Sequence, residues 1–388
     1  MMSLRLNRIS ILLEACLGCY LLDLEERLDL IVRNTEEVVT IDELRVLLET
    51  ASKPRAYWGF ECSGFMHIGM GLVCGSKIKD IARAGFDFTI FLADWHSWIN
   101  NKLGGVMENI RICGEYFKQC FEALGVTSSG NVRFVWASDI AGDIEYWEKV
   151  IRIAKSSSLL RVRRALTIMG RELDMADIET AWIFYPCMQA ADVFHLELDM
   201  ACGGIDQRKA HMLARDAAEK MGWRKPVCLH TPLLSGLQPP AAGNLGSRFD
   251  EDTKISEKIS SKMSKSKPES CIFVHDSPEE IRSKIRAAYC PPKQEEGNPV
   301  LEHAKYIVFP ELGVMDVPRP AKYGGPVTFE NYSDLREAYL RGEVHPLDLK
   351  NGVAEALIKI LEPVREHFKS KPELLDEMRR IESGLKQE

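Results

Sequence analysis

The sequence predicts an α/β protein in which a doubly wound parallel sheet with crossover helices is followed by an α-helical domain. Strand-like runs rich in β-branched and aromatic residues alternate with helix-like segments over the first two thirds of the chain. The strand-like runs are residues 56–61, 87–94, 132–139 and 226–234, and the helix-like segments include 106–124 and 207–221. Beyond residue 268 the apolar residues recur three and four positions apart, which is typical of helices.

Length and composition set the broad class. The 388 residues allow two or three domains at about 150 residues each. A hydrophobic fraction of 45%, a charged fraction of 28% and a mean hydropathy of -0.16 exclude disordered, collagen-like and coiled-coil proteins. Acidic side chains outnumber basic ones by 57 to 50, which gives a formal charge of -7. A polyanionic partner must therefore bind on a local basic face.

The cysteines and the N-terminus indicate a cytoplasmic protein. Eleven cysteines without regular spacing predict reduced thiols, and Cys16 and Cys19 form a C-x-x-C pair with no partner pair, so no metal site is expected. The apolar run near the N-terminus superficially resembles a signal peptide, but Glu14 interrupts it and no small-residue cleavage site follows. No stretch of about 18 apolar residues predicts a membrane span.

Helix signals divide the chain into three parts. Residues 21–34 and 41–51 have apolar side chains at helical spacing. Ser277 and Glu280 form a capping box around Pro278, which marks the start of a helix in the last part. The expected domains are a helical N-terminal extension at 1–52, a sheet domain at 53–267 with an insertion at about 100–180, and an α-helical domain at 268–388.

The first candidate site is the turn between the strand at 56–61 and the helix that follows it. The segment from Ser63 to Met70 includes His67 and Gly69. Backbone N–H groups at such a helix start can receive phosphate oxygens, and Gly69 permits a close approach. A capped core helix is the alternative interpretation.

The second candidate site is a lysine-bearing segment, Lys262-Met263-Ser264-Lys265-Ser266. It follows residues 238–261, whose Pro, Gly, Ser and charge content predicts a mobile loop. Flexible ammonium groups can neutralise the charge that develops on a triphosphate under attack. The alternative is a solvated loop.

The third candidate site is a polar face on an apolar helix. Tyr185, Gln189 and Asp192 lie at i, i+4 and i+7, so their side chains converge on one helix face. A glycine-containing segment, GGIDQRK at 203–209, follows. Such a face suits a polar ligand, although mutually satisfied polar atoms in a buried helix are the alternative.

Together, and in this order, these segments closely resemble the archaeal and eukaryotic tyrosyl-tRNA synthetases, which are class I aminoacyl-tRNA synthetases. Residues 67–70 and 262–266 correspond to the HIGH and KMSKS signatures. The other matching segments are YWGFECSG, FLADWH, YPCMQAAD, GGIDQRKAHMLAR, AAYCPP, KYGG and HPLDLKN. The resemblance extends from about Arg55 to Glu366. It implies a Rossmann-like catalytic domain, an α-helical anticodon-binding domain and a homodimer.

The resemblance assigns roles in the reaction. Tyr57 and Asp192 are expected to bind the phenolic hydroxyl of L-tyrosine. The rest of the tyrosine site is expected to be Gly59, Glu61, Ala93, His96, Tyr185, Gln189 and Gln207. The ATP site is expected to be Ser63, His67, Gly69, Met70, Gly203, Gly204, Asp206, Lys262, Met263, Ser264, Lys265 and Ser266, with His67, Lys262 and Lys265 catalytic and Mg²⁺ bound with ATP. Met70 departs from the pattern, because the family commonly has histidine there.

The resemblance also suggests where tRNA(Tyr) binds. A basic cluster of Lys155, Arg161, Arg163, Arg164 and Arg171 lies in the insertion that meets the acceptor stem in this family, and Arg208 and Lys209 are expected near the acceptor end. Tyr323, His345 and Asp348 match positions that bind the first anticodon base. The alternatives are a solvated basic helix face, and a helix that simply starts at His345-Pro346.

The sequence therefore predicts a homodimeric tyrosine–tRNA ligase that uses ATP. Three alternatives remain. A tryptophan-specific relative shares the fold and the lysine segment, but not the Gln189 and Asp192 pair or GGIDQRK. In an inactive RNA-binding paralogue, Met70 in place of histidine would be the first sign of lost catalysis. A small nucleotidylyltransferase would have no use for the C-terminal helices.

Overall fold

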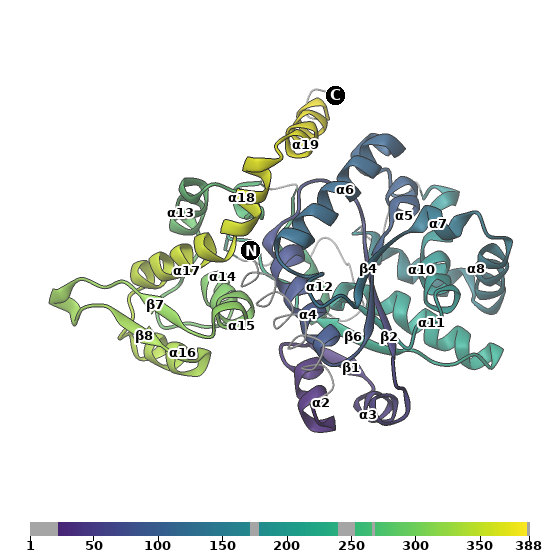
Figure 1. Cartoon of the computed structure of the whole chain (residues 1–388), viewed down its shortest axis with the longest axis horizontal. Coiled ribbons are helices and arrows are strands. Elements are labelled where there is room, and N and C mark those ends of the chain that lie inside the picture. Colours follow the sequence, from purple (N-terminus) through teal and green to yellow (C-terminus); the bar gives the residue numbers. More distant parts are fainter. Residues whose placement is uncertain (1–21, 171–177, 240–252, 266–267, 386–388) are drawn as a thin grey trace, which may run out of the picture. The chain divides into compact units, whose positions relative to one another are not determined.

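The computed structural model describes residues 22–170, 178–239, 253–265 and 268–385. The chain forms two compact units (Figure 1). The first, here called the sheet unit, consists of Met1–Ser63, Lys77–Gly114 and Gly125–Pro232. The second, the C-terminal unit, consists of Gly64–Ser76, Glu115–Leu124 and Leu233–Glu388.

A six-stranded sheet forms the centre of the sheet unit, with strand order β1-β6-β5-β2-β3-β4. The strands are β1 (Glu37–Val39), β2 (Arg55–Phe60), β3 (Asp87–Leu92), β4 (Val132–Trp136), β5 (Met200–Gly204) and β6 (Val227–Thr231). β2 to β6 pair in parallel, and β1 alone is antiparallel, beside β6. The predicted α/β class is confirmed, and the four predicted strand-like runs correspond to β2, β3, β4 and β6.

Helices cover the sheet on both sides. Figure 1 shows α8, α10 and α11 on one side and α4 on the other. Apolar side chains from β2, β3, α8, α10 and α11 form one buried cluster that includes Phe91, Val150, Met188 and Leu213. The helices of this part of the chain are α2 (Leu24–Val32), α3 (Ile41–Thr50), α4 (Gly75–Arg83), α5 (Asp94–Ile99), α6 (Met107–Ala123), α7 (Ala137–Ala141), α8 (Ile144–Ser156), α9 (Leu159–Ala165), α10 (Phe184–His195) and α11 (Arg208–Met221). Its short π and 3-10 turns are η1 (Gly69–Cys74), η2 (Lys102–Gly105), η3 (Leu166–Met169), η4 (Thr180–Ile183) and η5 (Ile205–Gln207).

The N-terminal region contains both expected helices and one strand that the sequence did not predict. Asp23 and Thr40 begin α2 and α3 with capping boxes. Between them, β1 pairs with β6 in the register Glu37↔His230. The expectation of a purely helical extension misses this strand, because three residues are too few to show an alternating pattern.

The C-terminal unit is mostly helical, as predicted. Ser277 caps α13 through the expected capping box, with Pro278 in the first turn. α17 packs against both α13 and β7. Its elements are α12 (Thr253–Ser261), η6 (Pro268–Ser270), α13 (Pro278–Ala287), α14 (Pro299–His303), η7 (Ala304–Val308), α15 (Phe309–Leu312), β7 (Met315–Val317), η8 (Ala321–Tyr323), β8 (Val327–Phe329), α16 (Tyr332–Arg341), α17 (Pro346–Ile360), α18 (Glu362–Ser370) and α19 (Glu373–Gly384).

Two further expectations are corrected here. The β7–β8 hairpin was not predicted, because each strand has only three residues. The predicted mobile loop at 238–261 is helical at 253–261, where Ile255 and Ile259 lie one turn apart and Ile259 is buried. Residues 240–252 of that loop lie outside the described residues.

The described cysteines are free thiols, as expected, and most of them are buried. Cys16 and Cys19 belong to the part of the chain that the structure does not describe. Within the described ranges, no helix is long and apolar enough to span a membrane.

Candidate active site

The polar face of α10 is present as predicted. Tyr185, Gln189 and Asp192 lie on this twelve-residue helix at i, i+4 and i+7. Their neighbours Met188 and Ala191 are fully buried, so the helix lies in the core. Asp192 is only 1% exposed. A carboxylate buried to this degree is costly unless it has partners, and the structure shows two.

Tyr146 and His96 hold the Asp192 carboxylate. The Tyr146 hydroxyl donates a hydrogen bond of 2.9 Å to Oδ1, and Nε2 of His96 lies 3.3 Å from Oδ2. Burial is the largest single influence on His96 and would lower its pKa, but the charge and hydrogen bonding of Asp192, together with the charges of Glu61 and Asp94, raise that pKa overall. Burial and the same charge raise the pKa of Tyr146 well above its usual value, so the phenol stays protonated as a donor.

Tyr57 lies beside this carboxylate at the buried centre of β2. Burial and the charge of Asp192 raise the pKa of Tyr57 well above its usual value. Its hydroxyl donates a long hydrogen bond of 3.5 Å to the Gln189 carbonyl oxygen. The structure thus brings Tyr57 and Asp192 together, as the sequence predicted. Tyr146 was missed, because it lies 46 positions from Asp192 and belongs to no motif.

Glu61 forms the centre of a second polar group. The Tyr185 hydroxyl donates 2.8 Å to Oε1 of Glu61, and Asn100 Nδ2 donates 2.7 Å to the same oxygen. Lys102 Nζ lies 3.5 Å from the other oxygen. Asn100 and Lys102 were not predicted, although they follow the FLADWH segment closely. A carboxylate has about four lone-pair positions, so Glu61 can accept a further hydrogen bond beside these contacts.

Gln189 and Gln207 connect α10 to the turn after β5. Gln189 Nε2 donates 3.2 Å to Oε1 of Gln207, and Gln207 Nε2 donates 3.1 Å to the Ile168 carbonyl oxygen. Among the described atoms, Oε1 of Gln189 is buried without a hydrogen-bond partner. An unpaired buried acceptor is unfavourable, so this oxygen is suited to a donor from a ligand.

The remaining residues of the predicted tyrosine-binding site lie at the ends of β2 and β3. Gly59 is the only exposed position of β2. A Cβ there would lie 3.8 Å from the Phe91 ring and 3.9 Å from the Tyr57 ring, so any larger side chain would project into the space beside them. Ala93 is buried and immediately precedes α5, which carries His96.

The predicted ATP residues are divided between the two units. In the sheet unit, Gly203 and Gly204 end β5, and Asp206 follows in η5. A Cβ at Gly203 would lie 2.9 Å from Gln207 Cβ and 3.1 Å from His211 Cε1. Internal packing therefore requires this glycine, whether or not a nucleotide approaches. The Ser63 hydroxyl, in the last residue of the first segment of the sheet unit, donates a hydrogen bond of 3.2 Å to the Glu61 carbonyl oxygen.

In the C-terminal unit, the backbone fixes the His67 ring. The Met70 N–H donates 3.3 Å to Nδ1 of His67. A Cβ at Gly69 would lie 3.0 Å from the ring, so Gly69 leaves room for it. Burial, together with the charges of Lys265 and Lys262, lowers the pKa of His67 to about 3. His67 is therefore neutral at pH 7, with its proton on Nε2. Met70 contributes through its backbone, which the loss of an imidazole at this position does not affect.

The lysine segment has a buried anchor. The Met263 side chain is 3% exposed, and its N–H donates 2.7 Å to the Leu234 carbonyl oxygen. Lys262 forms a β-bridge with Ser235, and Lys265 Nζ lies 5.3 Å from the centre of the Phe117 ring. The two lysines thus flank a fixed point, with Ser264 between them. Ser266 lies outside the described residues.

The predicted acceptor-stem cluster is partly exposed. Arg163 and Arg164 on α9 are exposed, as is Lys155 at the end of α8. Arg161 donates 2.9 Å to Asp216 on α11. Two further residues, Arg208 and Lys209, begin α11 and are half-buried. Arg171 belongs to the masked stretch 171–177, outside the described residues.

The predicted anticodon residues lie on two segments of the C-terminal unit. Tyr323 is 62% exposed on the turn between β7 and β8, with Lys322 Nζ 4.7 Å from its ring centre. His345 caps α17, because its Nδ1 accepts 3.2 Å from the Leu347 N–H. Asp348 follows in the first turn of α17 and is largely buried. The local helix start that the sequence offered as an alternative is thus present, whatever else these residues bind.

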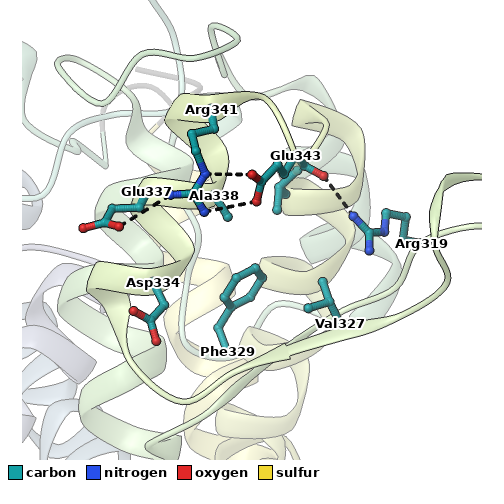
Figure 2. A pocket seen from close by; sticks show the side chains of 9 residues that line it. Arg319, Val327, Phe329, Asp334, Glu337, Ala338, Arg341 and Glu343 are labelled. Carbon is teal, nitrogen blue, oxygen red and sulfur yellow. Dashed lines mark hydrogen bonds and ion pairs between the residues drawn. The ribbon is translucent and has the colours of Figure 1, made fainter.

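Arg319 connects these two segments. Its Nε donates 2.8 Å to the Gly325 carbonyl oxygen, and its Nη1 donates 2.9 Å to that of Glu343. Gly324 has φ +101°, and a Cβ there would lie 3.0 Å from the Arg319 guanidinium. Figure 2 shows Arg319 at the edge of a pocket of about 240 Å³, which Arg341 and three carboxylates also line. The ion pairs of Arg341 with Glu343 and Glu337 balance much of the charge inside this pocket.

Comparison with known proteins identifies the family. Residues 49–244 and 255–362 match the family described as "tRNA synthetases class I (W and Y)". The tyrosine–tRNA ligase of Aeropyrum pernix is 49% identical over 94% of this chain and 98% of its own length. That of Saccharolobus solfataricus is 47% identical over 95% of this chain and 100% of its own.

Solved structures agree. The tyrosyl-tRNA synthetase of Pyrococcus horikoshii, in complex with L-tyrosine, superposes with a TM-score of 0.85 at 45% identity, covering 92% of this chain and all of that one. The tryptophanyl-tRNA synthetase of Aeropyrum pernix is 16% identical with a TM-score of 0.62, covers 88% of this chain and 85% of that one, and shares the fold alone. This chain therefore belongs to the archaeal-type tyrosyl-tRNA synthetases, within the class I family of tryptophan and tyrosine enzymes.

Proposed function

We propose that this protein joins L-tyrosine to ATP as tyrosyl-adenylate and then transfers tyrosine to the 3′ end of tRNA(Tyr). The observation that carries the proposal is the buried Asp192 carboxylate, held between Tyr146 and His96 and next to Tyr57. A carboxylate has about four lone-pair positions, so it can accept another hydrogen bond from a phenolic hydroxyl. Phenylalanine lacks this hydroxyl and would leave the buried polar atoms unpaired.

The other end of the amino acid has a matching polar group. The α-ammonium group would donate to Glu61, Tyr185 and Gln189, whose Oε1 is buried without a partner among the described atoms. Gln207 holds Gln189 in place. Gly59 and Ala93 leave space for the ring between the two ends.

In the first reaction, a carboxylate oxygen of tyrosine bonds to the α-phosphorus of ATP while the bond to pyrophosphate breaks. No side chain of the protein forms a covalent bond, so catalysis is positioning and charge stabilisation. The neutral His67 would donate from Nε2 to a phosphate oxygen, and Lys262 and Lys265 would neutralise the departing pyrophosphate. Gly203 and Gly204 would take the nucleoside, with Asp206 on the ribose hydroxyls. Mg²⁺ would be bound together with ATP, through its phosphate oxygens.

In the second reaction, the tRNA supplies the nucleophile. The exposed Arg163 and Arg164 would contact acceptor-stem phosphates together with Arg161, and Arg208 and Lys209 would lie near the acceptor end. Tyr323 would stack on an anticodon base, and His345 and Asp348 would bind its edge. We further propose that the protein acts as a homodimer.

The decisive experiment is tyrosine-dependent exchange of pyrophosphate into ATP with Mg²⁺ and without tRNA, run in parallel with tryptophan and phenylalanine. Exchange with tyrosine alone is the expected result. Exchange with tryptophan would assign the protein to the sister enzymes. No exchange with any of the three, from a folded protein that binds tRNA, would indicate an inactive RNA-binding relative.

A further inference from the structure

The short strand β1 contributes a carboxylate to the start of α11. Glu37 accepts a hydrogen bond of 2.8 Å from Nε of Arg208 on one oxygen and one of 3.0 Å from Nη2 on the other. His230, directly opposite Glu37 in the β1–β6 register, donates 2.9 Å from Nδ1 to the same carboxylate. Three donors therefore converge on Glu37, and two belong to a single guanidinium.

This arrangement fixes the direction of the Arg208 side chain. Two parallel hydrogen bonds to one edge of a planar guanidinium determine its orientation, which a single contact or a lysine would not. The Arg208 side chain nevertheless remains 38% exposed, so a large polyanion can reach it. Arg208 is thus a half-buried but accessible cation with a fixed orientation.

The position of Arg208 connects this pair to the substrate site. Arg208 directly follows Gln207, whose amide is hydrogen-bonded to Gln189 of α10. One residue is therefore tied to the tyrosine-binding helix, and the next is tied to β1. The turn that separates the amino-acid site from the expected acceptor end is held from both sides.

We propose that Glu37 is a positioning residue for tRNA charging, which orients the Arg208 guanidinium toward the acceptor end of the tRNA. The inference rests on the proposed function, because it takes Arg208 as an acceptor-end contact. It gives the N-terminal region a role in the second reaction, and Glu37 acts through Arg208 without touching either substrate.

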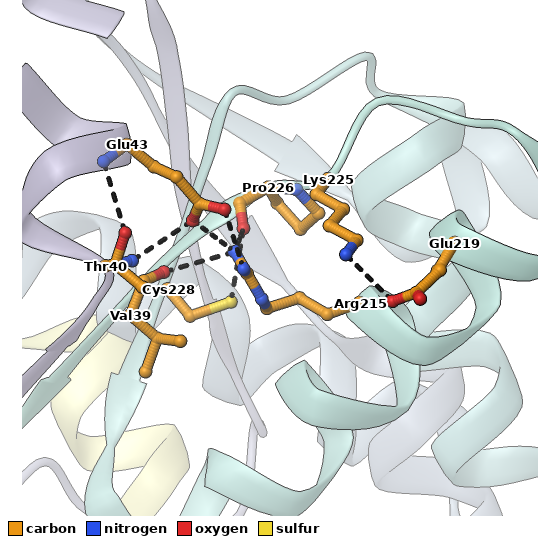
Figure 3. A network of polar contacts seen from close by, with 8 residues as sticks. All are labelled: Val39, Thr40, Glu43, Arg215, Glu219, Lys225, Pro226 and Cys228. Carbon is orange, nitrogen blue, oxygen red and sulfur yellow. Dashed lines mark hydrogen bonds and ion pairs between the residues drawn. The ribbon is translucent and has the colours of Figure 1, made fainter. Parts of the chain in front are cut away.

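A second ion pair provides a matched control. Glu43 of α3 accepts 2.7 Å and 2.9 Å hydrogen bonds from Arg215, which lies two turns after Arg208 on the same helix (Figure 3). Arg215 also donates to the carbonyl oxygens of Val39 and Pro226, and its side chain is 13% exposed. This pair joins the same N-terminal region to the same helix, but its arginine is mostly buried and is bound to backbone as well.

The test compares E37Q with E43Q in the full chain. For each variant, three quantities are measured: tyrosine-dependent pyrophosphate exchange, KM and kcat for charging of tRNA(Tyr), and the thermal unfolding midpoint. The glutamine replacements keep the shape but remove the charge. We expect both variants to unfold at lower temperature. In E37Q alone, kcat/KM for charging should fall at least about tenfold more than exchange does, since misplacing a contact by about 1 Å can cost more than that.

R208A separates the two possible failures. If R208A charges tRNA as well as wild type, Arg208 is no acceptor-end contact and that part of the proposed function is wrong. If R208A impairs charging but E37Q does not, the role assigned to Glu37 is wrong. If Glu37 acts through Arg208, adding E37Q to R208A should cause little further loss of charging.

The comparison with E43Q tests whether the role of Glu37 is specific. Equal losses of kcat/KM for charging in E37Q and E43Q would mean that Glu37 only stabilises the fold. Should E37Q not fold at the assay temperature, Glu37→Asp is measured in its place, with the same outcomes.

Discussion

The proposed amino-acid site and the proposed anticodon segments differ in how they would recognise their ligands. In the sheet unit, Asp192 is 1% exposed and its partners are buried side chains on separate elements. In the C-terminal unit, Tyr323 is 62% exposed, and the segment that carries it is held by a guanidinium bound to main-chain oxygens. In the proposed function, the first arrangement would select a small molecule by the cost of leaving buried polar atoms unpaired. The second would present an aromatic face on which a base can stack.

The largest expected effect comes from Asp192→Asn, which removes the charge at the centre of the buried arrangement. Tyr146 and His96 lose a charged partner, and the substrate's phenolic hydroxyl meets an amide that keeps only one acceptor oxygen and has no charge. We expect kcat/KM for tyrosine in pyrophosphate exchange to fall by about a hundredfold or more, or about 3 kcal/mol. Asp199→Asn is the control, because this largely buried carboxylate accepts 2.7 Å from the Arg55 N–H outside the proposed site. Wild-type exchange in the Asp192 variant would contradict the proposed pocket.

Two buried imidazoles, His96 in the sheet unit and His303 in the C-terminal unit, have pKa values shifted in opposite directions. Asp192 raises the pKa of His96, so the stability from this ion pair is lost as the pH rises through that raised pKa. In the C-terminal unit, burial lowers the pKa of His303 to about 3. Its unfolded pKa is about 6.5, so the unfolded chain binds more protons between these values. The stability due to a neutral His303 is therefore complete above pH 6.5 and falls as the pH is lowered toward 3.

This difference can be measured by denaturant unfolding at pH 7 and pH 4. The free energy of unfolding of the wild type should be about 3 kcal/mol lower at pH 4 than at pH 7 from His303 alone, and that of His303→Gln should fall correspondingly less. His345→Gln serves as the control, since His345 is exposed. The same acid loss in His303→Gln and wild type would show that the burial of His303 does not control its titration.

Tyr146→Phe is expected to have an intermediate effect. It removes one hydroxyl from Asp192 and leaves the rest of the buried arrangement in place. The apparent affinity for tyrosine should fall about fivefold, which corresponds to about 1 kcal/mol for one hydrogen bond. Tyr116→Phe is matched to it, since Tyr116 is equally buried and its hydroxyl lies 2.8 Å from His275 Nδ1 in the C-terminal unit. That control should lower stability only, and an equal change in tyrosine affinity would refute a specific role for Tyr146.

The smallest effect is expected for Arg319→Lys. Lysine keeps the charge but cannot hold the Gly325 and Glu343 carbonyl oxygens in the same fixed geometry. KM for tRNA should rise roughly threefold, and tyrosine-dependent exchange should stay near wild type. In Arg341→Lys, which alters the same pocket through side-chain ion pairs alone, KM for tRNA should not rise. A rise in both variants would mean that the pocket as a whole supports tRNA binding.

Local patterns and long-range contacts differ in how well the sequence predicts them. The polar face of α10 was predictable because three residues at helical spacing converge on one side. Its partners were not: Tyr146 and Glu37 reach Asp192 and Arg208 across 46 and 171 positions, respectively, and local patterns carry no information about such pairs. Individual roles, such as Tyr57 for the phenolic hydroxyl, came from the resemblance and stay predictions. The β1 strand and the β7–β8 hairpin were too short to show any periodicity.

The pairing of β1 with β6 also has a consequence for aggregation. β1 covers one long side of β6 through antiparallel pairing over Glu37, Val38 and Val39. A chain shortened to begin at Lys53 would leave that side of an entirely buried strand open, with unpaired N–H and C=O groups. Open strand edges of this kind recruit strands from other molecules. Shortened versions of the protein are therefore expected to aggregate, even though every residue of the proposed tyrosine site would still be present.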